Sequence, residues 1–196
     1  MIDINPMVIF LAAIFTNNMI FSYFLGMCSF ITVSNEIPTA LGLGQAVTFV
    51  TTATALINYL LYKYVLVPLN LEYLRFIVFI ITIAAFVQLL EMIVERYFPS
   101  LYYSLGIFLP LITVNCIVFA VSLFMVIRNY TFLQSVGYAA GSGLGWTLAI
   151  VAMAGAKQRI KNNNLPKGLE GPGITLIITG LMAIAFVGFS GIVQIQ

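Results

Sequence analysis

The sequence predicts an all-α integral membrane protein: six transmembrane helices in two inverted three-helix repeats, with broken helices carrying the cysteines. Three observations lead to this prediction. The chain has 196 residues and is 62% hydrophobic but only 7% charged, whereas a soluble domain carries about 25% charged residues. Its apolar residues form long continuous runs, which excludes the alternating pattern of a β-barrel. Finally, the two halves of the chain resemble each other in sequence.

Runs of about 20 apolar residues are long enough to cross a hydrocarbon core of about 30 Å. We predict spans at residues 7–33, 40–62, 74–94, 102–127, 132–156 and 173–193. The first run has no basic region before it and continues too far for a cleaved signal peptide, so we expect it to remain as a span. No segment is long and polar enough to be a linker between soluble domains. Residues 1–196 are therefore predicted to form a single transmembrane domain.

The distribution of lysine and arginine predicts the orientation of the spans. Five of these residues follow the first, third or fifth span, and three follow the second or fourth. The loop at 157–171 holds four of the five, so we expect it to be cytoplasmic and both termini to be periplasmic. Eight basic residues in all are too few for a nucleic-acid-binding surface, and no nucleic acid is expected as a partner.

Three pairs of segments repeat in the same order in the two halves. TNNMIF resembles TVNCIVF, TALGLGQAV resembles GYAAGSGLGW, and IITIAAFV resembles IITGLMAIAFV. Apolar helices can match by chance, but three ordered matches favour a true repeat, over about residues 7–94 and 102–193. Because each half holds three spans, the second copy enters the membrane in the opposite sense. Inverted repeats place functional sites near the midplane, at interrupted helices. The glycines of GSGLG fit close helix packing better than phosphate binding.

The two cysteines each lie beside a residue that weakens a helix. Cys28 follows Gly26, and Cys116 follows Asn115 and Pro110. Three interpretations stay open from these residues alone: small buried apolar side chains, a disulfide, or ligands of iron. An iron–sulfur cluster takes four protein ligands, so the third interpretation requires a second chain to supply two of them.

Two further residues stand out within the apolar runs. Glu91 lies near the end of the third predicted span, where a carboxylate is costly unless it is paired or hydrated. It is either an interfacial acid, paired with Arg96 or Arg75, or an oxygen ligand on a Na+ pathway. Trp146 lies within the fifth predicted span, where we expect it to pack against a neighbouring protein of a complex. The chain has no histidine and no nucleotide-binding motif, so we do not expect it to be catalytic alone.

The segments FLGMCSFITVS, QLLEMIVERYF, LGIFLPLITVNC, GSGLGWTLAIVAMAG and GITLIITGLMAIAF resemble one family of membrane proteins. It comprises the D and E subunits of the sodium-translocating NADH:quinone reductase (Nqr) and the A and E subunits of the related Rnf complex. The resemblance covers nearly the whole chain. GSGLGW and GPGIT are more similar to the Nqr E subunit than to the Rnf A subunit. The A subunit of an Rnf ferredoxin:NAD+ oxidoreductase and a metal-free secondary transporter with inverted repeats are kept as alternatives.

The resemblance implies a fold, a cofactor and partners. Family members have six helices in two inverted halves, and a homologous D subunit of opposite orientation shares an intramembrane [2Fe–2S] cluster. It implies that Cys28 in LGMC and Cys116 in TVNC are this chain's two ligands. From their positions beside these cysteines, Gly26 and Asn115 are candidates to support the ligand sulfurs, Asn115 by a hydrogen bond to sulfur. The resemblance also implies a Na+ pathway role for Glu91 of LEM. The complex contains A, B, C and F subunits, with FAD, FMN and riboflavin elsewhere. It carries electrons from NADH to ubiquinone and exports Na+ across the bacterial inner membrane.

Overall fold

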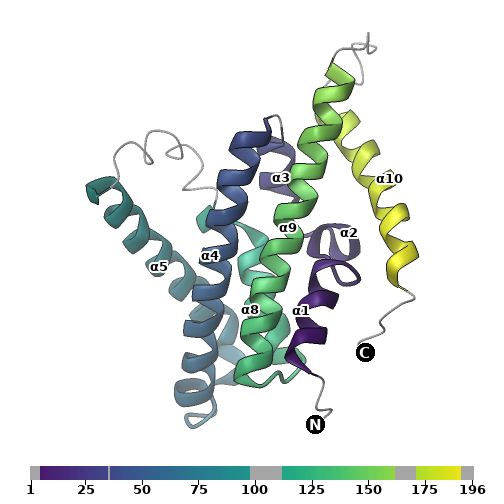
Figure 1. Ribbon diagram of the computed structural model, residues 1–196. Coiled ribbons are helices and arrows are strands. Elements are labelled where there is room, and N and C mark those ends of the chain that lie inside the picture. Colours follow the sequence, from purple (N-terminus) through teal and green to yellow (C-terminus); the bar gives the residue numbers. More distant parts are fainter. Residues whose placement is uncertain (1–4, 35, 98–111, 162–170, 191–196) are drawn as a thin grey trace.

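The computed structural model describes residues 5–34, 36–97, 112–161 and 171–190, and all regular elements within these ranges are helical (Figure 1). The long helices are α4 (Ile37–Leu61), α5 (Arg75–Tyr97), α9 (Phe132–Lys161) and α10 (Pro172–Ser190). The shorter ones are α1 (Pro6–Ile14), α2 (Met19–Tyr23), α3 (Met27–Val33) and α8 (Cys116–Ile127). A π-helical turn η1 (Tyr62–Leu66) and a 3-10 turn η2 (Glu72–Leu74) join α4 to α5.

Three helical stretches of the described chain are long and apolar enough to cross a membrane. They are Ile37–Leu66, Glu72–Tyr97 and Phe132–Ile160. They confirm the second, third and fifth predicted spans as long apolar helices. The fourth and sixth predicted spans correspond in part to α8 and α10, which are shorter apolar helices in the described residues. The remaining spans, and so the total of six, stay predictions.

Helices α4 and α9 run side by side in opposite directions through the middle of the molecule (Figure 1). Two glycine–threonine contacts bring them together. Gly44 of α4 faces Thr147 of α9, and Gly143 of α9 faces Thr48 of α4. A Cβ atom on Gly143 would lie 2.7 Å from the Thr48 Cα atom, so only glycine allows this approach. The Thr48 and Thr147 hydroxyl oxygens are 3.1 Å apart. Each helix thus contributes one glycine and one threonine to the crossing, in the same arrangement.

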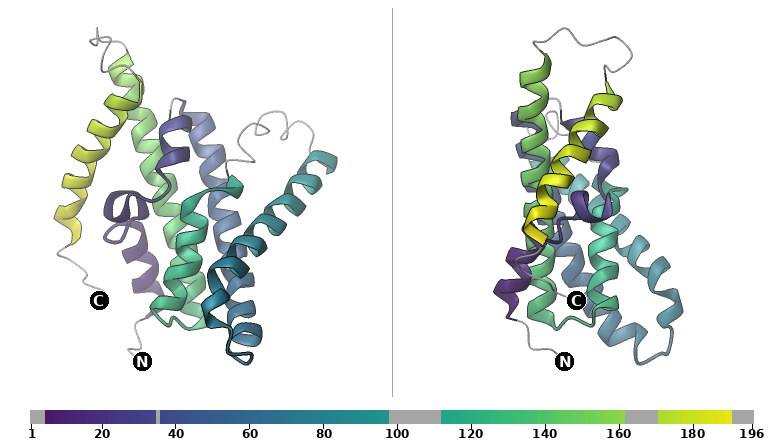
Figure 2. Two further views of the ribbon diagram at one scale, coloured as in Figure 1. Left: turned by 180° about the vertical axis from the view of Figure 1, so that it is seen from behind. Right: turned by 90° about the vertical axis from the view of Figure 1, so that its right-hand side faces the viewer.

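The other helices pack reciprocally around this central pair. Helix α1 packs on α9, and α8 packs on α4. Helix α5 contacts α4 and α8, while α10 contacts α9 and α2. Aromatic pairs accompany the outer contacts, with ring centroids 6.3 Å apart for Phe76 and Phe119 and 4.4 Å apart for Phe21 and Phe186. Seen from behind, α2, α3 and α8 lie together on one side of the central pair, and α5 and α10 lean away at opposite edges (Figure 2).

The first predicted span is broken into α1, α2 and α3. Residues 15–18 separate α1 from α2, and Asn18 accepts a hydrogen bond from the Ile20 N–H to begin the new helix. The second break combines left-handed conformations at Phe24 (φ 55°) and Gly26 (φ 86°). Left-handed backbone is disfavoured for residues with a Cβ atom, so Gly26 is well suited to this turn. The freed backbone groups of such a break need partners inside the protein.

Candidate metal centre

The two cysteines lie in the first turns of two helices that begin inside the bundle. Cys28 is the second residue of α3, and Cys116 is the first residue of α8. Gly26 precedes α3 in its left-handed turn, and Asn115 caps α8 by accepting a hydrogen bond from the Ile117 N–H at 3.3 Å. The Gly26 N–H lies within hydrogen-bond distance of Cys116 Sγ, so the structure brings the start of α3, with Cys28 two residues after Gly26, next to the start of α8. Both are free thiols, so no disulfide joins them.

A short hydrogen-bond network ties the two helix starts together. The Gly26 N–H donates to Cys116 Sγ at 2.9 Å. Asn115 Nδ2 donates to Ser29 Oγ at 3.0 Å, and the Ser29 hydroxyl donates to the Gly26 carbonyl at 3.3 Å. Asn115 and Ser29 are both buried, which strengthens these bonds relative to bonds in water. The network fixes the position of α3 relative to α8 and therefore of Cys28 relative to Cys116.

Two features of the surroundings of Cys116 act in opposite directions on a negative charge at its sulfur. The N-terminal end of α8 carries partial positive charge, which favours negative charge on the sulfur. Partial burial of Cys116 removes solvent and opposes that charge. A metal ion bound here would balance these two effects, because a coordinating thiol is deprotonated and the ion supplies the opposite charge. The Gly26 N–H supplies one hydrogen bond to the same sulfur.

The donor set fits half of a shared metal site. Cys28 is exposed and Cys116 is partly exposed, so the thiol pair opens onto the surface of the chain. Among the described residues, no group of three or more histidine, cysteine, aspartate or glutamate side chains could hold a metal ion. A cluster with four protein ligands would need two more from another chain. Two adjacent thiols at an open face provide the half that this chain would contribute.

The side chains of Asn18 and Asn115 satisfy backbone groups at the breaks. Asn18 Nδ2 donates to the carbonyl oxygens of Ile14 at 3.1 Å and of Gly145 at 2.8 Å. The second of these bonds docks the first break onto α9. Asn115 serves α8 and Ser29 through its two amide atoms, and the hydrogen bond to Cys116 comes from Gly26 instead. Pro110, the other predicted source of a break, lies outside the described residues.

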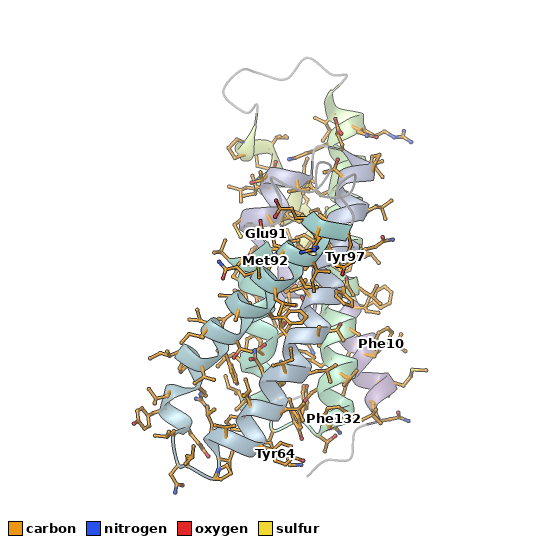
Figure 3. The ribbon with its side chains drawn as sticks, turned by 90° about the vertical axis from the view of Figure 1, so that its left-hand side faces the viewer. Phe10, Tyr64, Glu91, Met92, Tyr97 and Phe132 are labelled. Carbon is orange, nitrogen blue, oxygen red and sulfur yellow. The ribbon has the colours of Figure 1, made fainter. Side chains whose placement is uncertain are left out.

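Glu91 lies near the end of α5, beside the exposed Met92 (Figure 3). Arg75 begins the same helix, about 24 Å away along its axis at 1.5 Å per residue. The suggested pairing of Glu91 with Arg75 is therefore wrong. Glu91 is partly buried, whereas Glu95 and Arg96 one turn later are exposed. The structure does not bring Glu91 together with the cysteines, and its role in a Na+ pathway stays a prediction.

Trp146 occupies a position that the sequence does not indicate. It is fully buried within this chain, so the expectation that it packs against a neighbouring protein is wrong. Its indole Nε1 and Cδ1 atoms would lie 2.6 and 3.0 Å from a Cβ atom placed on Gly26. Ser29 is likewise a residue of the site that sequence reasoning missed. A serine or a tryptophan in an apolar run carries no local signal of such a contact.

Comparison with known proteins identifies the family. A family model described as "Rnf-Nqr subunit, membrane protein" matches residues 7–193. The chain belongs to the Rnf-Nqr family. It is therefore a member of a membrane protein family, and the regular elements of its described residues are all helices, with α4, α5 and α9 as the long apolar ones.

Relatives within the Rnf-Nqr family match over almost their whole length. The chain is 53% identical over 190 residues to the E subunit of the Na(+)-translocating NADH-quinone reductase of Serratia proteamaculans, and the match covers 94% of this chain and 96% of the relative. The E subunits of the same reductase from Dichelobacter nodosus and Aeromonas hydrophila are 53% and 54% identical over 191 and 186 residues. Each of these two matches covers 92% of this chain and 94% of the relative.

Proposed function

We propose that the chain is the E subunit of a sodium-translocating NADH:quinone reductase and part of an oxidoreductase complex. Full-length relatives at 53–54% identity with that name carry the proposal. Their bacterial sources support a place in the bacterial inner membrane. GSGLGW and GPGIT, together with these names, favour this function over that of the Rnf A subunit. We propose that the chain acts as one subunit of that complex and not as a catalyst alone, since its sequence holds no nucleotide-binding motif.

Within that complex, Cys28 and Cys116 are proposed to supply half the ligands of a [2Fe–2S] cluster. The homologous D subunit would supply the other half. Two free thiols on helix starts that the Gly26–Cys116 hydrogen bond joins support this assignment, as does their exposure at the surface of the chain. When bound, the cluster provides a one-electron relay inside the membrane. FAD, FMN and riboflavin would reside elsewhere, in a complex that also contains A, B, C and F subunits.

The residues of this chain would hold and tune such a site. Gly26 N–H donates to Cys116 Sγ, and hydrogen bonds to ligand sulfur are one of the determinants of a cluster's potential. The hydrogen bonds of Asn115 and Ser29 hold the first turns of α3 and α8, which carry the two cysteines, in a fixed relative position. Apolar side chains such as Phe30 and Ile117 are fully buried next to them along α3 and α8. They exclude water from the protein side of the site.

We infer that the chain consists of two inverted repeats with six spans. Several reciprocal features support this inference. Gly44 and Thr147 mirror Gly143 and Thr48 at the central crossing, and α1 on α9 mirrors α8 on α4. Asn18 and Asn115, which match in the repeat TNNMIF and TVNCIVF, each cap a helix that begins inside the bundle. A pseudo-two-fold axis would pass between the Thr48 and Thr147 hydroxyls.

The proposed cofactor is tested by chemical analysis of the purified complex. We expect the wild-type complex to contain more iron and acid-labile sulfide than its soluble subunits hold. Replacing Cys28 by alanine should lower the iron content by two atoms per complex. A metal-free secondary transporter of the same fold would give equal iron contents for the wild-type complex and the Cys28→Ala variant. That equality would remove the cluster from the proposal.

Glu91 is proposed to act on the Na+ pathway, because its oxygens suit a hard cation and it is partly buried near the end of α5. Replacement of Glu91 by glutamine removes the negative charge and keeps the shape. We expect a rise of about tenfold in the Na+ concentration that half-saturates turnover, the effect of losing about 1.4 kcal/mol of binding. Glu95→Gln is the matched control and should keep the wild-type value, because Glu95 lies one turn later on the same side of α5 but is exposed. Unchanged Na+ dependence in Glu91→Gln would contradict this role.

The proposed topology places both termini in the periplasm. In the structure, α1 begins at the lower end of the bundle and α10 runs downward toward the same end (Figure 1). Alkaline phosphatase, which is active only in the periplasm, should be active when fused after Gln196. Green fluorescent protein, which fluoresces in the cytoplasm, should be dark there and bright when inserted between α9 and α10, at residues 162–170. The reverse pattern would invert the orientation of the chain.

A further inference from the structure

The two breaks of the first span contact α9 at two consecutive residues, Gly145 and Trp146. The Gly145 carbonyl accepts the hydrogen bond from Asn18 at the first break. Trp146 lies against Gly26 at the second break, with Nε1 2.6 Å from the point where a Cβ atom on Gly26 would stand. Asn115 Oδ1 lies 3.7 Å from that same point. Trp146 therefore touches the turn that connects α2 to α3, beside the cap of α8.

The indole of Trp146 is held by packing. The side chain is fully buried and belongs to the main apolar core. Its Nε1 atom is buried and has no hydrogen-bond partner among the described residues. A buried donor without a partner costs free energy and calls for an explanation. Because the indole is held in the core without this hydrogen bond, we attribute its role to the shape of the ring.

The shape of the indole matters because the ring lies against Gly26, whose N–H donates to a cysteine sulfur. Gly26 has a positive φ angle of 86° and donates its N–H to Cys116 Sγ. Its missing Cβ atom leaves the space that the edge of the indole fills. Removing the indole would open that space and let the turn rotate. The Gly26 N–H would then leave the sulfur, and Cys28, two residues later, would move relative to Cys116.

We propose that Trp146 is a positioning residue for the thiol pair: the edge of its buried indole fixes the Gly26 turn and so sets Cys28 against Cys116. The arrangement of the thiols is a property of this chain alone. Its consequence for iron binding rests on the proposed function. The two consequences are measured separately below.

The rate of disulfide formation between Cys28 and Cys116 reports the positioning directly. The purified complex is stripped of metal with a chelator under reducing conditions, the reductant is removed, and diamide is added to take two electrons and two protons from the thiol pair. Mass spectrometry then follows the Cys28–Cys116 disulfide. We expect Trp146→Ala to slow its formation about tenfold or more, since misplacing reacting atoms by about 1 Å can cost about 100-fold. Trp146→Phe keeps the inner ring edge and should react within about twofold of wild type.

Met153→Ala is the matched control, because Met153 is also fully buried on α9 but is not among the atoms nearest Gly26. A wild-type rate in Trp146→Ala, or equal slowing in Met153→Ala, would overturn the proposal. Equal slowing in Trp146→Phe would also overturn it, because the N–H rather than the ring edge would then matter. Where Trp146→Ala does not assemble, Gly26→Ala is measured instead, because the added Cβ atom collides with the indole. We then expect Gly26→Ala to slow disulfide formation and Trp146→Phe not to slow it.

Iron content provides the second measurement. We expect Trp146→Ala to lose most of the iron that Cys28→Ala loses. Trp146→Phe should retain that iron, with an EPR line shape that changes no more than in Met153→Ala. If the wild-type complex holds no iron at this site while the disulfide rates follow the expected order, the cluster fails and the positioning role stands. If iron is present and the disulfide rates do not change, the positioning role fails and the cluster stands.

Discussion

Replacement of Cys116 by alanine is expected to abolish quinone reduction by the complex and to remove the EPR signal of one [2Fe–2S] centre. Cys116 begins α8, and its Sγ accepts a hydrogen bond from the N–H of Gly26, two residues before Cys28. A cluster that loses one of four thiolates has no substitute nearby, because the described chain offers no third cysteine, histidine or carboxylate at the site. A relay near the midplane divides a hydrocarbon core of about 30 Å into shorter electron transfers, so its loss interrupts the path.

The measurement compares NADH oxidation by an artificial acceptor with reduction of ubiquinone, in the same purified complex. The first activity should stay near wild type and the second should fall below detection. Ser22→Ala serves as the control, because Ser22 is exposed on α2, four residues before Gly26, and within the described residues its hydroxyl donates to the Thr16 carbonyl. Retained EPR intensity together with retained ubiquinone reduction in Cys116→Ala would reject the ligand assignment.

Replacement of Gly143 by alanine is expected to destabilise the chain strongly, although the change adds a single methyl group. That group would lie 2.7 Å from the Thr48 Cα atom, which belongs to the backbone of α4 and cannot rotate away. The two central helices would have to separate, and overpacking of this kind costs typically about 1–3 kcal/mol. The Thr48–Thr147 hydroxyl contact at 3.1 Å would be lost as well.

Gly155→Ala provides a matched control on the same helix, because a Cβ atom there meets nothing within 4 Å. Alanine is favoured over glycine within a helix by about 0.5–1 kcal/mol, so this variant should be as stable as wild type or more stable. The midpoint of thermal unfolding of the purified complex in detergent measures both effects. Equal shifts for the two variants would show that α4 and α9 do not meet at Gly143.

The sequence was a good guide to where helices form and where they stop. Apolar run length alone predicted α4, α5 and α9. The break of the first span could be expected because Gly26 tolerates a positive φ angle and Asn18 can cap a new helix. These are local properties of a residue and its neighbours, and local properties can be predicted from a single sequence.

Contacts between distant segments were not predictable in the same way. A helix in a membrane can be apolar on every side, since lipid and protein core are both apolar. Apolar periodicity therefore does not reveal which face of α9 meets the protein. For this reason Trp146 was expected at an interface with another protein, although it lies against Gly26. The pairing of Glu91 with Arg75 failed for a different reason, namely that both belong to one continuous helix.

Anomalous X-ray scattering at the iron absorption edge, recorded from crystals of the intact complex, tests the central claim most directly. We predict an iron peak in bonding contact with the sulfurs of both Cys28 and Cys116, at the boundary between this chain and a second membrane protein that supplies two further cysteine sulfurs. Cysteine sulfurs that lie apart, or that lie together in an active complex with no iron peak beside them, would contradict it.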